Sequence, residues 1–292
     1  MLLPYNVGMS PSPVALLVSI VTFEPDRAWL DRTLASLARA ITHARGEAVL
    51  GATTVVIACN DREADANLDL ALTTHLGVCD GVSRVVLSGH GNVGYGRANN
   101  LGVNHVEALR PHDVLLVLNP DVEINETALT YALRYLANHA DCALVSPVVR
   151  GVDGSPQYLA KRFPTPWVLA LRGFAPKFMR AWFAATLAHY ERRDTAFDAD
   201  CEGLRIVSGC FMVMRMSAFQ AVGGFDPRFF LYFEDFDLSL RVSEKARVVR
   251  LAGCEILHGG GAAARKGLRH TIYFMRAAWW FFAKHGVRYR GD

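Results

Sequence analysis

The sequence lacks the features that mark several common classes of protein. Its six cysteines are scattered and include no C-x-x-C pair, so neither a zinc cage nor a disulfide framework is indicated. No uninterrupted apolar stretch reaches about 18 residues, and the start of the chain has no basic region of the kind that opens a signal peptide. Internal repeats and low-complexity tracts are also missing. These absences predict a reduced, cytoplasmic protein that meets a membrane only at its surface.

A strong excess of one charge is missing too. The formal net charge is +3 over 292 residues, so the total gives no sign of a nucleic-acid partner. The C-terminus is the exception, because seven Lys or Arg residues and one acid lie between Arg265 and Asp292, around the aromatic run AAWWFFAKHG. Such a segment fits either peripheral contact with the inner face of the cytoplasmic membrane or a buried helix with a solvated basic face. The sequence leaves both open.

Apolar residues, by contrast, are abundant and well patterned in the first half. Short apolar runs typical of buried parallel strands alternate with segments whose apolar residues recur at helical spacing. The predicted strands are 14–21, 53–58, 84–88 and 113–118, and the predicted helices lie around 30–41, 95–109 and 125–138. This rhythm predicts an α/β fold with a Rossmann-like, mostly parallel central sheet and flanking helices, which binds ligands at the carboxyl ends of its strands.

The second half is less regular. No steady period runs from about 150 to 205, which predicts an irregular insertion with one or two short helices and loops. Strand character returns at 205–215, a short helix ended by glycines follows, and 246–258 predicts two last short strands.

The segment GHGNVGYG contains G-x-G-x-x-G, with Gly89, Gly91 and Gly94 placed between a predicted strand and a predicted helix. This is the form of a dinucleotide-binding fingerprint, yet it follows the third strand, and the next acidic strand end, Asp121, comes 27 residues after Gly94 rather than about 20. The turn can instead present backbone N–H groups to a phosphate or ribose, or be only a turn.

Two further strand ends carry polar side chains. LNPDVEI places Asn119, Asp121 and Glu123 after a strongly apolar strand, where a divalent cation on a diphosphate needs one or two carboxylate oxygens, although the same residues also suit a helix cap. ILHGGGAAARKG places His258 ahead of three glycines and a basic pair, Arg265 and Lys266. That segment fits a lid over a diphosphate or a plain linker.

The stretch LYFEDFDLSLR sets three carboxylates, Glu234, Asp235 and Asp237, beside apolar and aromatic residues. Either they cap a helix, or a cationic or reactive group meets them.

Five segments in this order carry a family resemblance: VSIVTFEPD, GNVGYGRANNLGV, LNPDVEI, SGCFMVMRMSAFQAVGGFDPRFFLYFEDFDLSLR and EILHGGG. Together they resemble the family-2 inverting glycosyltransferases of the GT-A fold, and specifically the bacterial rhamnosyltransferase-like branch that builds O-antigen and other surface polysaccharides. The resemblance covers roughly 14–285. It implies one GT-A domain over 1–292, with a nucleotide-sugar-binding half at 14–124, an acceptor and catalytic half at 125–258, and a lid loop with a C-terminal helix at 259–292.

The resemblance also implies roles for single residues. Asp121 would hold Mg²⁺ or Mn²⁺ on the donor diphosphate, His258 would complete the metal site, and Asn119 stands in the place of the first acid of the D-x-D pattern. The metal would neutralise the departing nucleoside diphosphate, with help from Arg265 and Lys266.

Asp235 matches the second acid of the family's E-D-x-D motif and would be the general base that deprotonates the acceptor hydroxyl in a single inverting displacement. Apolar neighbours and the other two carboxylates are expected to raise the pKa of Asp235. Glu234 and Asp237 are assigned to the acceptor and sugar site, and Asp237 also suits a cap or an orienting contact.

Around the nucleotide, the resemblance assigns Thr22, Glu24, Asn60, Asp61, Asn92 and Gly94. Relatives often have Asp-Asn after the second strand, where the Asp reads the base, but this chain has Cys59-Asn60-Asp61. Because a cysteine accepts that hydrogen bond poorly, base recognition would shift to Asp61 or to backbone groups. The expected donor is a dTDP- or UDP-linked sugar, with dTDP-rhamnose foremost, and the expected acceptor is a lipid-linked or growing glycan.

Two other readings remain open. One is a nucleotide-dependent oxidoreductase that uses the glycine turn at 89–94, and the other is a catalytically silent carbohydrate-binding relative.

Overall fold

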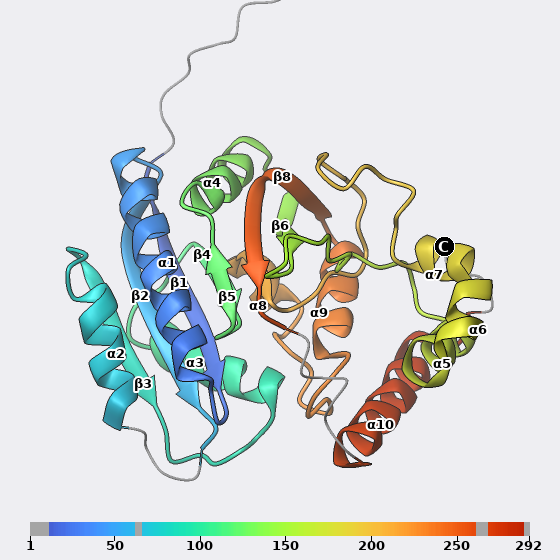
Figure 1. The fold of residues 1–292 in the computed structure, drawn as a ribbon. Coiled ribbons are helices and arrows are strands. Elements are labelled where there is room, and N and C mark those ends of the chain that lie inside the picture. Colours follow the sequence, from blue (N-terminus) through green and yellow to red (C-terminus); the bar gives the residue numbers. More distant parts are fainter. Residues whose placement is uncertain (1–11, 62–65, 261–267, 289–292) are drawn as a thin grey trace, which may run out of the picture.

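The structure is a computed structural model that describes residues 12–61, 66–260 and 268–288. One eight-stranded sheet runs through these residues in the order β3-β2-β1-β4-β7-β6-β8-β5 (Figure 1). The strands are β1 (Val14–Thr22), β2 (Leu50–Cys59), β3 (Val82–Leu87), β4 (Val114–Leu118), β5 (Val122–Ile124), β6 (Cys142–Arg150), β7 (Phe211–Arg215) and β8 (Arg247–His258). Four neighbouring strands, β3 to β4 in the sheet order, are parallel, as are β6 and β8, whereas β7 and β5 run antiparallel to their neighbours. The predicted α/β class with a mostly parallel sheet is confirmed.

Helices cover both faces of this sheet. They are α1 (Arg27–Gly46), α2 (Ala66–Leu76), α3 (Tyr95–Glu107), α4 (Ala128–Asn138), α5 (Pro166–Phe174), α6 (Lys177–Trp182), α7 (Ala184–Tyr190), α8 (Met216–Ala221), α9 (Glu234–Ser243) and α10 (Leu268–His285). One core cluster joins the sheet to α1, α2 and α4, and a second joins its other face to α3, α8 and α9. Helices α5, α6, α7 and α10 gather at the end of the molecule far from β3 (Figure 1).

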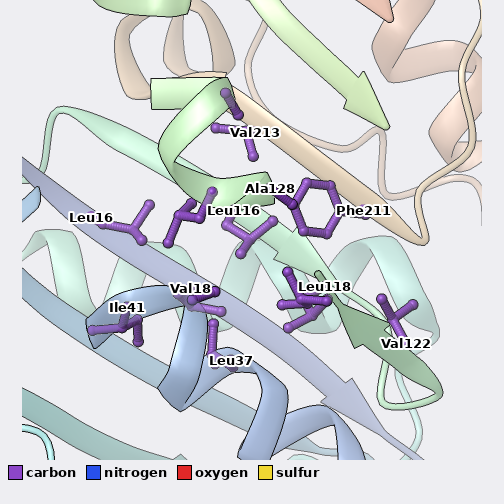
Figure 2. Packing of buried hydrophobic residues seen from close by; sticks show 14 of the residues in the cluster. Leu16, Val18, Leu37, Ile41, Leu116, Leu118, Val122, Ala128, Phe211 and Val213 are labelled. Carbon is purple, nitrogen blue, oxygen red and sulfur yellow. The ribbon is translucent and has the colours of Figure 1, made fainter. Parts of the chain in front are cut away.

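The apolar runs of the central strands are buried on both faces, which explains why they read as continuous rather than alternating in the sequence. In β1, Leu16 and Val18 face the helices α1 and α4, while Leu17 between them belongs to the opposite cluster. Figure 2 shows Leu37 and Ile41 of α1 packed beneath β1 and β4. The sheet is therefore a rigid support for whatever lies at the ends of its strands.

Three predictions about individual elements were wrong, one in the bounds of a strand and two in the number of elements. The strand predicted at 205–215 forms only at Phe211–Arg215, because the chain before it turns at Gly209, whose N–H bonds a carboxylate of α9. The segment 246–258 is one strand rather than two, and its pairing register shifts opposite Pro147/Val148. The insertion holds three short helices, α5 to α7, rather than one or two.

In the described part of the chain, no helix combines the length and apolar character needed to cross a bilayer. Helix α10 packs one face into an aromatic cluster with α5 and α9, and its other face is exposed.

Candidate functional site

Strand ends from both halves of the chain meet at one edge of the sheet. Thr22 at the end of β1 pairs in register with Cys59 at the end of β2, and Leu118 at the end of β4 lies opposite Phe211 at the start of β7. Because β7 is antiparallel, its first residues reach the edge where the parallel strands end. The Gly209–Cys210 turn is thereby brought beside Asn119, whose N–H donates to the Cys210 carbonyl at 2.9 Å.

Hydrogen bonds link the residues predicted to bind the nucleotide. The Asn60 side chain donates to the Gly94 carbonyl at 3.4 Å, and the Asn60 N–H donates to the Thr22 carbonyl at 2.8 Å. Asn92 accepts from the Gly94 N–H at 3.1 Å. The structure thus brings Thr22, Asn60, Asn92 and Gly94 together where β1, β2 and β3 end.

Asp61 holds the Cys59–Asn60–Asp61 stretch against the loop after β1. One carboxylate oxygen accepts the Glu24 N–H at 2.8 Å, and the other accepts the Cys59 thiol at 3.3 Å. Burial raises the pKa of Cys59, so it remains a thiol that can donate this bond. Glu24 has a positive φ of 45°, a conformation uncommon for a residue other than glycine. Asp61 thus stabilises an unusual backbone turn at the predicted base site.

The pair predicted to hold the metal is also brought together. The Asp121 Oδ1 and His258 Nε2 atoms lie 3.6 Å apart, since β5, which follows Asp121, pairs with the end of β8. Gln157 fixes the ring, because its Nε2 donates to the His258 carbonyl at 3.2 Å and its Oε1 faces Nδ1 at 2.9 Å. An amide oxygen only accepts, so Nδ1 carries the proton and the Nε2 lone pair faces Asp121.

This arrangement suits a divalent cation. Burial lowers the pKa of His258, against the opposing charge of Asp121, which favours the neutral imidazole that binds metals. A lone pair facing a carboxylate is repulsive unless a cation lies between them, and two ligands about 2.1 Å from one ion are roughly 3–4 Å apart. No cluster of three or more His, Cys, Asp or Glu ligands occurs in the described ranges. Two protein ligands match Mg²⁺ or Mn²⁺ held mainly by a diphosphate and water.

Asp235 sits in the first turn of α9, and backbone donors hold both of its oxygens. Oδ2 accepts from the Gly209 N–H at 2.9 Å and Oδ1 accepts from the Phe236 N–H at 2.9 Å. Burial raises the pKa of Asp235, although these bonds to the ionised form oppose the shift. A carboxylate with a raised pKa and fixed orientation is suited to accept a proton.

The turn at Cys210 lies between Asp235 and the Asp121–His258 pair. Burial first, and then the charges of Asp121 and Asp235, raise the pKa of the Cys210 thiol to about 12. The Cys210 carbonyl accepts the Asn119 N–H two residues before Asp121, and Gly209 before it leaves little room for a side chain, because a Cβ there would lie 3.0 Å from the Asp235 Cβ. Asp235 and the Asp121–His258 pair therefore lie on either side of one short turn, which the sequence predicted as part of a strand.

Glu234 is buried beside Asp235 over the first turn of α3, and its Oε2 has no hydrogen-bond partner in the described part of the chain. Burial, and then the charge of Asp235, raise the pKa of Glu234 well above its usual range. The raised pKa favours the protonated form of Glu234, and its unpartnered oxygen is available to a ligand.

Asp237 faces away from this site, contrary to its assignment to the acceptor and sugar site. It is fully buried and bonds Arg241 at 2.6 Å, Lys284 at 2.6 Å and His285 at 2.8 Å. Burial would raise the pKa of Asp237, but His285, Arg241 and Lys284 lower it overall. Its carboxylate is fully used in anchoring α10 to α9, so we assign it to the structure of the fold.

Tyr190, at the end of α7, is a further candidate for the site that the sequence did not predict. Its hydroxyl is buried without a hydrogen-bond partner in the described residues, and the Arg172 guanidinium approaches it without completing a hydrogen bond. Burial raises the pKa of Tyr190, and Asp235 is close enough to add to the shift. The Tyr190 carbonyl accepts the Arg162 N–H at 2.9 Å, next to Lys161, which pairs with Ile206 ahead of the Gly209 turn. No signal in the irregular insertion singled it out.

Of the remaining predicted site residues, the structure describes only Asn119. Asn119 reaches the edge of the site through its backbone. Arg265 and Lys266, and with them the predicted lid, lie outside the described residues.

A comparison with protein families gives a match to the glycosyl transferase family 2 model over residues 18–223. The chain belongs to this family. N-acetylglucosaminyl-diphospho-decaprenol L-rhamnosyltransferase of Mycobacterium tuberculosis (strain H37Rv) is 27% identical over 208 residues, which are 65% of this chain and 66% of the relative. Rhamnosyltransferase WbbL of Escherichia coli K12 is 31% identical over 158 residues, 52% of this chain and 55% of WbbL. The matched part thus spans about two thirds or less of these relatives' length.

Among solved structures, a crystal structure of GalNAc-T7 with UDP, GalNAc and Mn²⁺ matches with a TM-score of 0.57 at 13% identity. The match covers 85% of this family-2 glycosyltransferase and 44% of the GalNAc-T7 chain. At that identity the likeness is one of fold, and it confirms the predicted GT-A architecture.

Proposed function

We propose that this family-2 glycosyltransferase transfers L-rhamnose from dTDP-rhamnose, with inversion, to a hydroxyl of a lipid-linked or growing surface glycan at the inner face of the cytoplasmic membrane. The single observation that carries the proposal is the Gly209–Cys210 turn, which bonds Asp235 through the Gly209 N–H and the Asn119 backbone, two residues before Asp121, through the Cys210 carbonyl. An inverting transfer needs one base on the acceptor side and a stabilised leaving group on the other. The rhamnosyltransferase names of the relatives support the choice of sugar.

Each group in the site has a role in this proposal. Asp235 takes the proton of the attacking hydroxyl, while its backbone donors keep it aligned. Asp121 and His258 would hold Mg²⁺ or Mn²⁺, which would neutralise the charge that develops on the departing diphosphate. Thr22, whose buried hydroxyl also lacks a partner among the described residues, and Asp61 line the nucleotide side with Glu24, Asn60, Asn92, Gly94 and Asn119. Glu234 donates a hydrogen bond from its neutral carboxyl to a sugar.

The oxidoreductase alternative finds little support in the geometry. A dinucleotide would place its pyrophosphate on the N-terminus of α3, but the first N–H of this helix, from Tyr95, is already bonded to the Phe230 carbonyl at 3.0 Å. Gly94 accommodates that backbone contact instead.

A donor screen tests the proposal. The purified chain is mixed with dTDP-rhamnose, UDP-galactose, UDP-N-acetylhexosamines, GDP-mannose and NAD(P)H, each with and without Mn²⁺ or Mg²⁺. We expect metal-dependent binding and slow hydrolysis of dTDP-rhamnose, both lost in Asp121→Ala. With an acceptor present, Asp235→Asn should retain donor binding but lose about 10²–10⁴ in kcat. Preference for another sugar nucleotide would refute the donor assignment, and binding of NAD(P)H alone would refute the class of reaction.

A further inference from the structure

Exposed apolar side chains are concentrated on the helices of the insertion and on α10. Fourteen large apolar side chains are exposed among the described residues, and seven of them lie on α5, α6 and α10 or just after α10. The seven are Trp167, Phe178, Trp182, Ile272, Met275, Trp279 and Val287. Trp182 is 88% exposed and Phe178 is 70% exposed, values unusual for side chains of this size.

On α10 these side chains form a stripe opposite the buried face. Ile272, Met275 and Trp279 recur at helical spacing and are exposed, while Ala277 and Phe281 on the other side pack into the core. Arg269 and Arg276, three residues before and four residues after Ile272, flank the stripe and are exposed as well. The helix therefore has two apolar faces, of which the protein covers only one.

The same helices carry charge of one sign. Helices α5, α6, α7 and α10 contain six Lys or Arg residues and no Asp or Glu. They lie together, because Leu169 of α5 shares a core cluster with Ala277 and Phe281 of α10 (Figure 1). We call the exposed surface of α5, α6 and α10 the basic–aromatic platform.

We propose that the basic–aromatic platform binds the surface of an anionic lipid bilayer. Tryptophan and phenylalanine rings insert at the level of the headgroups, and nearby arginines attract anionic lipids, so this composition matches an interfacial site. A second copy of the chain fits less well, since two such platforms face to face would bring like charges together. The insertion helices α5 and α6 join α10 in this surface, which extends the contact beyond the C-terminal segment.

The platform is fixed rigidly to the catalytic helix. Lys284 and His285 of α10 bond Asp237 of α9, and the rings of Phe281 and Phe233 lie 5.3 Å apart. Phe233 immediately precedes Glu234 and Asp235. Docking on a bilayer would therefore hold the base at a set distance from the lipid surface, where a lipid-linked acceptor presents its sugar. This consequence depends on the proposed function, whereas lipid binding itself does not.

Vesicle co-sedimentation of the full chain tests the platform without any substrate. Vesicles of phosphatidylcholine are compared with vesicles that also contain phosphatidylglycerol. We expect binding that requires phosphatidylglycerol and weakens with salt. Arg276→Glu should reduce the partition coefficient by about 25-fold, because it changes the charge by two units at about fivefold per unit. Arg110→Glu, the same charge change on the loop after α3, should leave it nearly unchanged.

A second pair of variants tests the apolar contribution to lipid binding. Trp279→Ala should weaken binding several-fold, whereas Leu109→Ala, which removes another exposed apolar side chain, should not. Equal losses in Arg276→Glu and Arg110→Glu, or no binding of the wild type to anionic vesicles, would overturn the proposal. So would a wild-type dimer in sedimentation velocity that Trp279→Ala dissociates, since a second copy would then cover the platform. Donor hydrolysis is measured without vesicles. If the wild-type chain hydrolysed no sugar nucleotide, the proposed function would be refuted and the lipid-binding result would still stand.

Discussion

The backbone carbonyl of Phe230 accepts the N–H of Tyr95 at 3.0 Å, which joins the glycine turn 89–94 to the acidic stretch 231–241. Gly94, just before Tyr95, has a φ of +89°, and a Cβ at this position would lie 2.3 Å from the Phe230 oxygen. Two segments that are far apart in the sequence therefore form one unit, in which the glycine is required by the close approach of another backbone.

Gly94→Ala and Gly89→Ala separate that contact from simple backbone strain. Gly89 has nearly the same φ, +85°, but nothing lies within 4 Å of a Cβ added there. Both substitutions should lose about 1–3 kcal/mol of unfolding free energy to the positive φ. Gly94→Ala should lose a further ~2 kcal/mol to overpacking against Phe230. Urea unfolding measures both values, and equal losses would mean that the Phe230 contact is not what selects glycine.

Asp237→Asn should destabilise the protein by about 3–5 kcal/mol, because it leaves Arg241, Lys284 and His285 without their shared buried carboxylate. The folded pKa of Asp237 is lowered, so its stabilising contribution is present above the ordinary aspartate pKa and is lost as pH falls through the folded value. The difference between wild type and variant should therefore shrink in acid. Thermal unfolding against pH measures it, with the exposed Asp80→Asn as control.

The same variant decides between two roles for Asp237. If Asp237→Asn remained as stable as the wild type but bound acceptor poorly, the sugar-site assignment made from the sequence would be right and the anchoring role wrong.

Glu234→Gln should stabilise the fold at neutral pH by about 1 kcal/mol, because ionising a buried, unpartnered carboxyl is unfavourable. The folded pKa of Glu234 is raised, so the native state binds the proton more tightly and stability falls as pH rises above the ordinary glutamate value of about 4.3. Below that value both states are protonated, and the gain should vanish. Glu244→Gln, at an exposed position just after the same helix, should show no such pH dependence in calorimetry.

The sequence predicted the parts of the site that follow apolar strands and missed those that depend on the insertion. Asp121 and His258 were recognisable because each follows a strand whose apolar run is unmistakable. The roles of Asp235 and Asp237 could not be separated so easily. Side chains two positions apart on a helix point in different directions, and only the packing of α10 shows which way each one faces. Tyr190 lies in a segment without periodicity, so nothing local indicated that its hydroxyl would be buried near the base.

Tyr190→Phe gives opposite expectations for stability and activity. Removing a buried hydroxyl that has no partner in the described residues should leave the unfolding free energy unchanged or raise it by up to about 1 kcal/mol. Tyr135→Phe is the matched control, because that hydroxyl donates to Glu202 at 3.0 Å and its loss should lower stability by about 1 kcal/mol.

A hydroxyl that does nothing for the fold is explained if it binds substrate. The charge of Asp235 adds to the raised pKa of Tyr190, which lies at the end of α7 in the insertion, so we expect its hydroxyl to bond the acceptor. Tyr190→Phe should therefore raise KM for the acceptor about tenfold, in keeping with the loss of one hydrogen bond, while KM for the donor stays constant. If the variant were instead destabilised and its acceptor KM were unchanged, Arg172 would be the hydroxyl's partner in solution and Tyr190 would belong to the fold alone.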